Sequence, residues 1–267
     1  IIGTVIASLL PIGAISHIYY ADRLNQFPLA IFGIAMGIVL LPSLSKAIKK
    51  NNQDEIQTIQ NRSLEFCLLI SIPSAVGLYI LSEPIIYILF ERGAFVSNDT
   101  LYTSRVLSMF ALGLPAYILI KVLVTCFFAR EDTKIPLYVS VVSVAVNIIL
   151  SLIFIQLMRE MGIALATAIS AWLNVLLLYV LLKMRGSITL DSRLISHGVK
   201  TIICSIAMGI ACYFLNLTLF PHMIMYSTII NVGFLIFAIA ICKIIYMVMI
   251  FMLKVLTIDE LKGYLKK

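Results

Sequence analysis

Charged residues are scarce in this sequence. Asp, Glu, Lys and Arg make up 12% of its 267 residues, whereas 61% are hydrophobic and the mean hydropathy is +1.06. A water-soluble domain carries about 25% charged residues, and the core of a globular domain of this size cannot hide so much apolar surface. The composition therefore excludes a soluble globular protein and predicts a chain that folds in a lipid bilayer.

The sequence also has few of the residues that build metal or catalytic centres. Its five cysteines form no C-x-x-C pair and lie in apolar stretches, so they indicate neither a zinc site nor a disulfide framework. The three histidines (His17, His197 and His222) are scattered along the chain and predict no cluster. A P-loop is absent as well, so nothing indicates that ATP supplies energy.

Long apolar runs take the place of charge. Crossing the hydrocarbon requires about 20 apolar residues in a helix. Stretches of this kind cover residues 14–48, 55–81, 99–128, 133–158, 162–182, 194–217 and 223–253. We also expect a partial helix over 1–10, a short interfacial helix over 85–90 and a basic surface helix over 257–267. The predicted fold is an all-α polytopic membrane bundle of about eight segments, the first one partial.

Two further expectations concern the organisation of the chain. The sequence opens with Ile1 inside an apolar run, which we interpret as a chain that lacks its N-terminal part. Residues 1–253 are predicted to form one transmembrane unit, and residues 254–267 a cytoplasmic basic tail.

The basic residues gather in alternate loops. A net charge of +7 could indicate a nucleic-acid partner, but the distribution of Lys and Arg follows the positive-inside rule instead. One side holds Lys46, Lys49, Lys50, Arg62, Arg130, Lys134, Lys183, Arg185, Arg193, Lys200, Lys254, Lys262, Lys266 and Lys267. The other side holds Arg92, Arg105 and Arg159. This asymmetry predicts a cytoplasmic C-terminus and contacts with anionic membrane lipids, not with nucleic acid.

Three basic residues lie inside the predicted helices, where topology does not explain them. An ionised Arg23 on a lipid face would cost a few kcal/mol or more, so it should face the bundle or a watered cavity. A pair with Asp22 is one interpretation, and a site for an anionic substrate is the other, because a guanidinium can donate two hydrogen bonds to a phosphate. Asp22 lies about 100° round the helix and need not neutralise the same face. For Lys243 we predict snorkelling, whereas for Lys121 snorkelling and exposure to a cavity both remain open.

Two neighbouring predicted helices carry oxygen ligands of the type that bind a small cation. Asn147 and Ser151 share a face at i, i+4 spacing. Thr167 follows Ile163 by four residues, and the carbonyl of Ile163 lies beside Gly162. Hydrogen bonds between packed helices explain the same residues more simply.

Three strings of residues, taken together, resemble the MurJ/MviN family of lipid II flippases. The first is Tyr19-Tyr20-Ala21-Asp22-Arg23-Leu24, continued by Phe27-Pro28, Gly33-Ile34-Ala35-Met36-Gly37 and Leu40-Leu41-Pro42-Ser43-Leu44-Ser45. The second is Leu89-Phe90-Glu91-Arg92-Gly93-Ala94-Phe95 with Asp99-Thr100. The third is Phe127-Phe128-Ala129-Arg130-Glu131-Asp132-Thr133-Lys134 with Pro136. The resemblance covers essentially the whole chain, from the end of the family's transmembrane helix seven to helix fourteen.

The resemblance implies a function as well as a fold. The fold would be one lobe of a multidrug/oligosaccharidyl-lipid/polysaccharide exporter, in which two pseudo-symmetric bundles surround a central cavity, so the partner would be the missing N-terminal lobe. Such a protein is a transporter and not an enzyme. It flips lipid II, the undecaprenyl-pyrophosphate-linked disaccharide-peptide of cell-wall synthesis, from the cytoplasmic to the periplasmic leaflet of the bacterial inner membrane by alternating access.

The family's basic positions match Arg23 and Arg130. The resemblance implies that Arg23 meets the pyrophosphate or peptide carboxylates of the substrate. Arg130 would serve the cytoplasmic gate or act as a topological anchor. With these two residues we expect Asp22, Gln26 and Lys121 to bind the substrate.

The sequence departs from the family pattern at two places. Gln26 stands where many relatives have Glu, so the cavity loses an anion. The family's sodium site would map to Asn147, Ser151, Ile163 and Thr167, but Ser151 and Gly3 replace two acidic ligands, which weakens the expectation of bound Na⁺. The membrane potential or an ion gradient is then the expected source of energy.

Two alternatives remain. An exporter of the same fold could carry drugs or other polyprenyl-linked glycans. A membrane enzyme such as a polyprenyl-phosphate glycosyltransferase would need acidic residues at the membrane surface, where only the pair Glu131-Asp132 is placed.

Overall fold

The computed structural model describes residues 2–11, 13–35, 39–223 and 228–255, and in this part of the chain the regular elements are α-helices, with a π turn at residues 39–40. The helices are α1 (Ile2–Ala7), α2 (Ala14–Ala35), α3 (Leu41–Lys49), α4 (Gln53–Ile80), α5 (Ser82–Phe90), α6 (Ser97–Phe128), α7 (Lys134–Met158), α8 (Glu160–Met184), α9 (Ser192–Met223) and α10 (Thr228–Met252). The predicted all-α class is confirmed for these residues.

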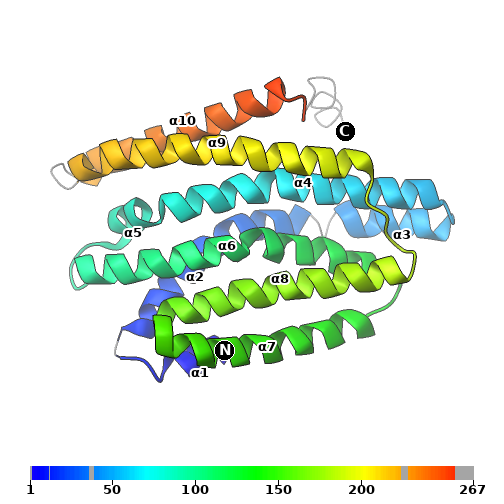
Figure 1. Ribbon diagram of the computed structural model, residues 1–267, viewed down its shortest axis with the longest axis horizontal. Helices are drawn as coiled ribbons and strands as arrows, with labels where there is room; N and C mark the ends of the chain where they lie inside the picture. The colour runs from blue at the N-terminus through cyan, green and yellow to red at the C-terminus, as the bar shows by residue number, and fades with distance from the viewer. Residues whose placement is uncertain (1, 12, 36–38, 224–227, 256–267) are drawn as a thin grey trace.

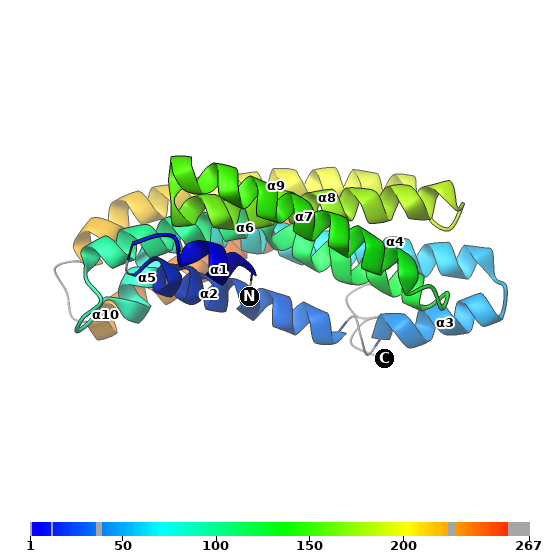
Figure 2. The same cartoon turned by 90° about the horizontal axis from the view of Figure 1, so that it is seen from below.

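The long helices lie side by side along the longest axis of the molecule. In Figure 1 they form rows from α10 and α9 at the top, through α4 and α6, to α8 and α7 at the bottom, and neighbouring rows contact one another. Figure 2 shows α2 and α3 one after the other along one side of the bundle. Helix α6 contacts α2, α4, α5 and α8, and is therefore the centre of the bundle.

Six helices within the described residues are long and apolar enough to cross a membrane. They are α4, α6, α7, α8, α9 over Ser192–Thr218 and α10 over Ile230–Met252. Helix α2 is not among them, because the polar run from Asp22 to Gln26 lowers its hydropathy. Together these helices make the chain a multi-pass membrane protein.

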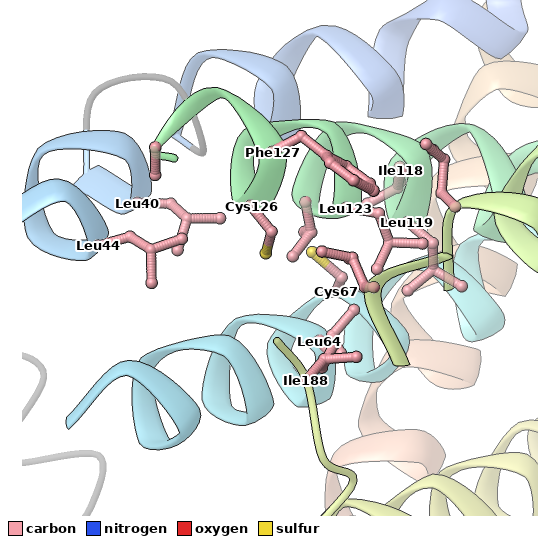
Figure 3. Packing of buried hydrophobic residues seen from close by; sticks show 14 of the residues in the cluster. Leu40, Leu44, Leu64, Cys67, Ile118, Leu119, Leu123, Cys126, Phe127 and Ile188 are labelled. Atoms are coloured by element: carbon pink, nitrogen blue, oxygen red, sulfur yellow. The ribbon is translucent and has the colours of Figure 1, made fainter. Parts of the chain in front are cut away.

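Figure 3 shows the largest apolar cluster at close range. Leu64 and Cys67 of α4 point toward Leu123 and Phe127 of α6. Ile188, in the connection between α8 and α9, also belongs to this cluster. A second cluster joins α1, α2, α6 and α8, and a third joins α4, α9 and α10. Packing against α6 thus fixes where α2 and α8 lie.

Most of the predicted helices agree with the structure to within a few residues at each end. The exception is the single helix predicted over residues 14–48, which the structure describes as two helices, α2 and α3. Pro42 stands in the first turn of α3, where proline is well tolerated. The surface helix predicted over 257–267 lies outside the described residues.

Candidate functional site

Helix α2 has a buried face and an exposed face, and both are polar in part. The buried residues Ala14, His17, Ile18, Ala21 and Asn25 recur at the spacing that forms one stripe of a helix. Tyr19, Arg23, Gln26 and Phe27 are exposed on the other side. The two faces therefore offer polar groups to two different environments.

A cavity of about 560 Å³ lies between α2, α6 and α8. Its lining consists of Asp22, Asn25, Gln26, Leu29, Ala30, Phe110, Tyr117, Lys121 and Thr167. Three residues predicted from the sequence to bind substrate, namely Asp22, Gln26 and Lys121, thus share one cavity. Because Lys121 lines this cavity, the structure favours exposure to a cavity over snorkelling, the other alternative for this residue.

One wall of the cavity holds a carboxylate that is bound to an amide. Nε2 of Gln26 donates a hydrogen bond to Oδ2 of Asp22 at 2.5 Å. A glutamate at position 26 would place a second carboxylate against Asp22, so the departure from the family pattern at this residue removes a like-charge contact. The Gln26 amide gives the Asp22 carboxylate a hydrogen-bond donor in place of a cation.

Two polar groups of the cavity were missed by sequence reasoning. Asn25 is 3% exposed and its Oδ1 has no hydrogen-bond partner among the described residues. The Tyr117 hydroxyl is also buried without such a partner, and it lies over Gly113, where an added Cβ would stand 2.5 Å from it. The sequence carried a signal for both, because residues three or four apart lie on the same face of a helix. Asn25 follows Asp22 by three residues, and Tyr117 precedes Lys121 by four.

Arg23 lies on the exposed face of α2 and is not part of the cavity lining. Its Nη2 donates a hydrogen bond to the Tyr19 hydroxyl at 2.7 Å, and its Cζ stands 4.8 Å from the centroid of the Tyr19 ring. Within the described residues it forms no ion pair, so the alternative of a structural pair with Asp22 is not what the structure has. The guanidinium keeps donors available for an anion.

Arg130 lies away from this cavity, at the junction of α6 and α7. It is half-buried, donates to the carbonyls of Cys126 at 2.8 Å and Ser187 at 2.9 Å, and partial burial lowers its pKa below the ordinary value. Asp132 beside it accepts a hydrogen bond from Arg185 at 2.6 Å, which lowers the pKa of this carboxyl. Both contacts hold the connection between α8 and α9.

The same connection is fixed from α4. Nδ2 of Asn61 donates to the carbonyl of Thr189 at 2.8 Å, and its Oδ1 accepts from the backbone of Asp191 at 3.2 Å. Arg62 pairs with both Glu65 and Asp191. Arg62 and Arg185, which were predicted to serve topology alone, therefore also form ion pairs that hold this end of the bundle together.

The four residues predicted as a sodium site lie on α7 and α8. Nδ2 of Asn147 stands 3.2 Å from the hydroxyl of Thr167, which donates to the carbonyl of Ile163 at 2.8 Å. Ser151 is fully buried, and its hydroxyl has no partner among the described residues. Gly3 is close to this group, since a Cβ there would stand 3.6 Å from Ile163. The set holds no carboxylate and is joined by interhelical hydrogen bonds, so it fits Na⁺ poorly.

A second cavity, of about 660 Å³, lies mainly between α4, α9 and α10. Its lining is almost entirely apolar and includes Pro28, Phe66, Leu69, Met208 and Ile239. Lys243, for which snorkelling was predicted, contributes the only charged side chain among the described lining residues. This cavity suits a hydrocarbon chain.

The first two motifs quoted from the sequence meet in space. The ring of Tyr20 lies 4.7 Å from that of Phe90 and 5.6 Å from that of Phe95, measured between centroids. These contacts join the start of α2 to α5 and to the residues just before α6. The candidate site comprises the α2 cavity and the neighbouring exposed Arg23, whereas Arg130 lies at a separate junction.

The chain is similar to proteins of one family. The model of the family "Lipid II flippase MurJ" matches residues 1–233. The probable lipid II flippase MurJ of Rhizobium tropici is 40% identical over 268 residues, which cover 100% of this chain and 50% of that protein. Its counterpart in Rhizobium meliloti (strain 1021) is 42% identical over 201 residues, covering 75% of this chain and 38% of the relative.

A solved structure is similar as well. It is described as a lipid II flippase MurJ in an inward closed conformation, with a TM-score of 0.77 and 29% sequence identity, over 93% of this chain and 49% of that one. The chain thus spans about half the length of these proteins.

Proposed function

The chain belongs to the MurJ family of lipid II flippases, and on this basis we propose that it supplies one lobe of a transporter that moves lipid II across the bacterial inner membrane. The second lobe would be the half of the relatives that this chain does not match. The two lobes would surround a central cavity, as in a two-lobe exporter, and α2 would cross the membrane as a further span. The basic loops and the C-terminus would face the cytoplasm.

The polar headgroup of the substrate is the part that is costly to move through the membrane. A diphosphate with a disaccharide and a peptide cannot cross about 30 Å of hydrocarbon without losing its water. Fixed donors and charges that replace this water lower the cost of the passage. Alternating access then exposes the headgroup to each side in turn.

The observation that carries the proposal is the polar surface of α2, which has Arg23 on its exposed face and Asp22 and Gln26 in the adjacent cavity. Arg23 would bind the diphosphate from the exposed face, because its planar group can donate two hydrogen bonds to two phosphate oxygens. Lys121 and Asp22, which line the adjacent cavity, would receive the peptide carboxylate and an amino group. Gln26 and Asn25 add amide contacts there.

The apolar cavity supports a place for the lipid part of the substrate. Its volume of about 660 Å³ and its apolar lining suit a polyprenyl chain. Lys243 would meet a phosphate at the edge of this cavity or an anionic membrane lipid. Headgroup and tail would then occupy different surfaces of one lobe.

The membrane potential or an ion gradient would drive the cycle. We assign no step to Na⁺, because the set of Asn147, Ser151, Ile163 and Thr167 lacks a carboxylate. Arg130 would act on the cytoplasmic gate through the connection that it holds in place. The protein would work as a transporter and not as an enzyme.

Replacement of a cell's own flippase tests the proposal. The complete transporter is produced in a bacterium depleted of its lipid II flippase, and growth and inner-leaflet lipid II are followed. We expect restored growth and no accumulation of lipid II. If the protein reaches the membrane at normal levels but lipid II still accumulates, an exporter of drugs or of another polyprenyl-linked glycan is the better description.

A further inference from the structure

A buried histidine joins three helices at one end of the bundle. His17 of α2 is 7% exposed, and its Nδ1 lies 3.2 Å from Oε1 of Glu160, the first residue of α8. Its Nε2 lies 3.0 Å from Oδ1 of Asp99 in the first turn of α6. In Figure 1 the starts of these three helices lie together at the left end, opposite the α3–α4, α6–α7 and α8–α9 connections.

Two carboxylates on opposite ring nitrogens favour a charged ring. A neutral imidazole donates from one nitrogen only, so the lone pair on the other would face a carboxylate oxygen. The imidazolium donates on both sides, and both contacts are then favourable charge-assisted hydrogen bonds. Glu160 is 5% exposed, so loss of the positive charge would remove the ion pair of a buried carboxylate.

Some neighbouring groups favour the charged forms of these three residues and others disfavour them. Asp99 and Glu160 stand at helix N-termini, which favour carboxylates. His17 stands near the N-terminus of its own helix, which disfavours a cation, and the exposed Arg159 acts on Glu160. Tyr102 of α6 stacks on the ring at 5.6 Å. Helix α1 has no titratable residue, and no titratable side chain of α4 interacts with His17.

We propose that His17, Asp99 and Glu160 form a proton-binding site that fastens the start of α2 to α6 and α8 while the ring is charged and releases it when the ring is neutral. The two carboxylates lie against opposite ring nitrogens, so they do not converge on a shared metal ion, and the described residues contain no group of three His, Cys, Asp or Glu placed to hold one. The same helix carries Arg23 and Asp22. Protonation at this end would therefore set the position of the proposed substrate-binding helix, a consequence that rests on the proposed function.

The charge of the ring is measured first. NMR of histidine-labelled complete transporter between about pH 5 and pH 9 follows the imidazole, and the spectrum of His17→Gln identifies its signal. We expect a titration within this range, and Glu160→Gln should move its midpoint down by about one pH unit or more. A ring that keeps one charge state over the whole range overturns the proposal.

The position of α2 is measured next. Spin labels on Ser16→Cys and Val96→Cys report the spacing of α2 and the start of α6, and the native cysteines of the described residues are buried. The spacing should widen as pH rises through the ring's midpoint. His17→Gln should abolish this dependence, while His197→Gln, a histidine that also faces a carboxylate, Glu65, should keep it.

A spacing that stays constant while the ring titrates contradicts the proposal. So does a His17→Gln variant whose spacing still changes with pH. The proposed function can fail separately. If the wild-type transporter does not move lipid II, that function is wrong, whereas the ring titration and the spacing remain as measured.

Discussion

Nη2 of Arg130 donates a hydrogen bond to the backbone carbonyl of Ser187 at 2.9 Å, across 57 residues of sequence. Nη1 of the same group donates to the carbonyl of Cys126 in the last turn of α6. A cation at the C-terminal end of a helix also interacts favourably with the helix dipole. One guanidinium thus completes α6 and fixes the connection between α8 and α9, which makes Arg130 a positioning residue.

Removal of this group should loosen the connection. Arg130→Ala loses two hydrogen bonds from a charged donor, and because the side chain is half exposed we expect a loss of about 1–2 kcal/mol in local stability. Amide exchange in residues 185–191 should become about tenfold faster. Lys134→Ala, a neighbouring exposed basic residue, is the control. Equal exchange in both variants would show that the contact with Ser187 does not hold the connection.

The contact between α7 and α8 is predicted to tolerate no side chain at Gly162. A Cβ there would stand 2.4 Å from the carbonyl oxygen of Phe154, a backbone atom that cannot move alone. Gly162→Ala should therefore separate the two helices and lower the melting temperature. Gly77→Ala is the matched control, since nothing lies within 4 Å of its added Cβ and alanine favours a helix by about 1 kcal/mol. A Gly162→Ala protein as stable as Gly77→Ala would refute the close packing.

Two added carboxylates should turn the oxygen cluster on α7 and α8 into a sodium site. Ser151→Asp together with Gly3→Asp places two carboxylates near Asn147 and the carbonyl of Ile163, and Na⁺ would relieve their burial. The melting temperature of this variant should be higher in sodium chloride than in choline chloride, by about 2–4 °C for each kcal/mol of binding. Ser151→Asn is the neutral control. A wild-type protein that is itself stabilised by sodium would show that neutral ligands suffice.

Much of the fold follows from the sequence because a bilayer imposes helix length and apolar composition. Helices α4 to α8 were predicted to within a few residues for this reason. The end of α2 at Ala35 and the start of α3 at Leu41 were not predicted, since Pro28 and Gly33 permit a bend without fixing where a helix ends.

Contacts between distant residues were beyond sequence reasoning. His17 lies 82 residues from Asp99 and 143 from Glu160, and no local pattern links them. Likewise, Arg130 gave the signal of a topological anchor, but its bond to Ser187 depends on how α8 packs on α6. Helical periodicity assigned Arg23 and Asp22 to different faces correctly, whereas only the packing of α2 decided which of them lines the cavity.

Lipid II transport by Arg23→Ala in the complete transporter tests most directly whether Arg23 binds the diphosphate headgroup of the substrate. Arg105→Ala, which removes an exposed arginine of α6, is the control, and membrane levels of both variants are compared with the wild type. Loss of two charge-assisted hydrogen bonds should lower transport at least about tenfold, with partial recovery in Arg23→Lys. Transport by Arg23→Ala at the wild-type rate would contradict the account.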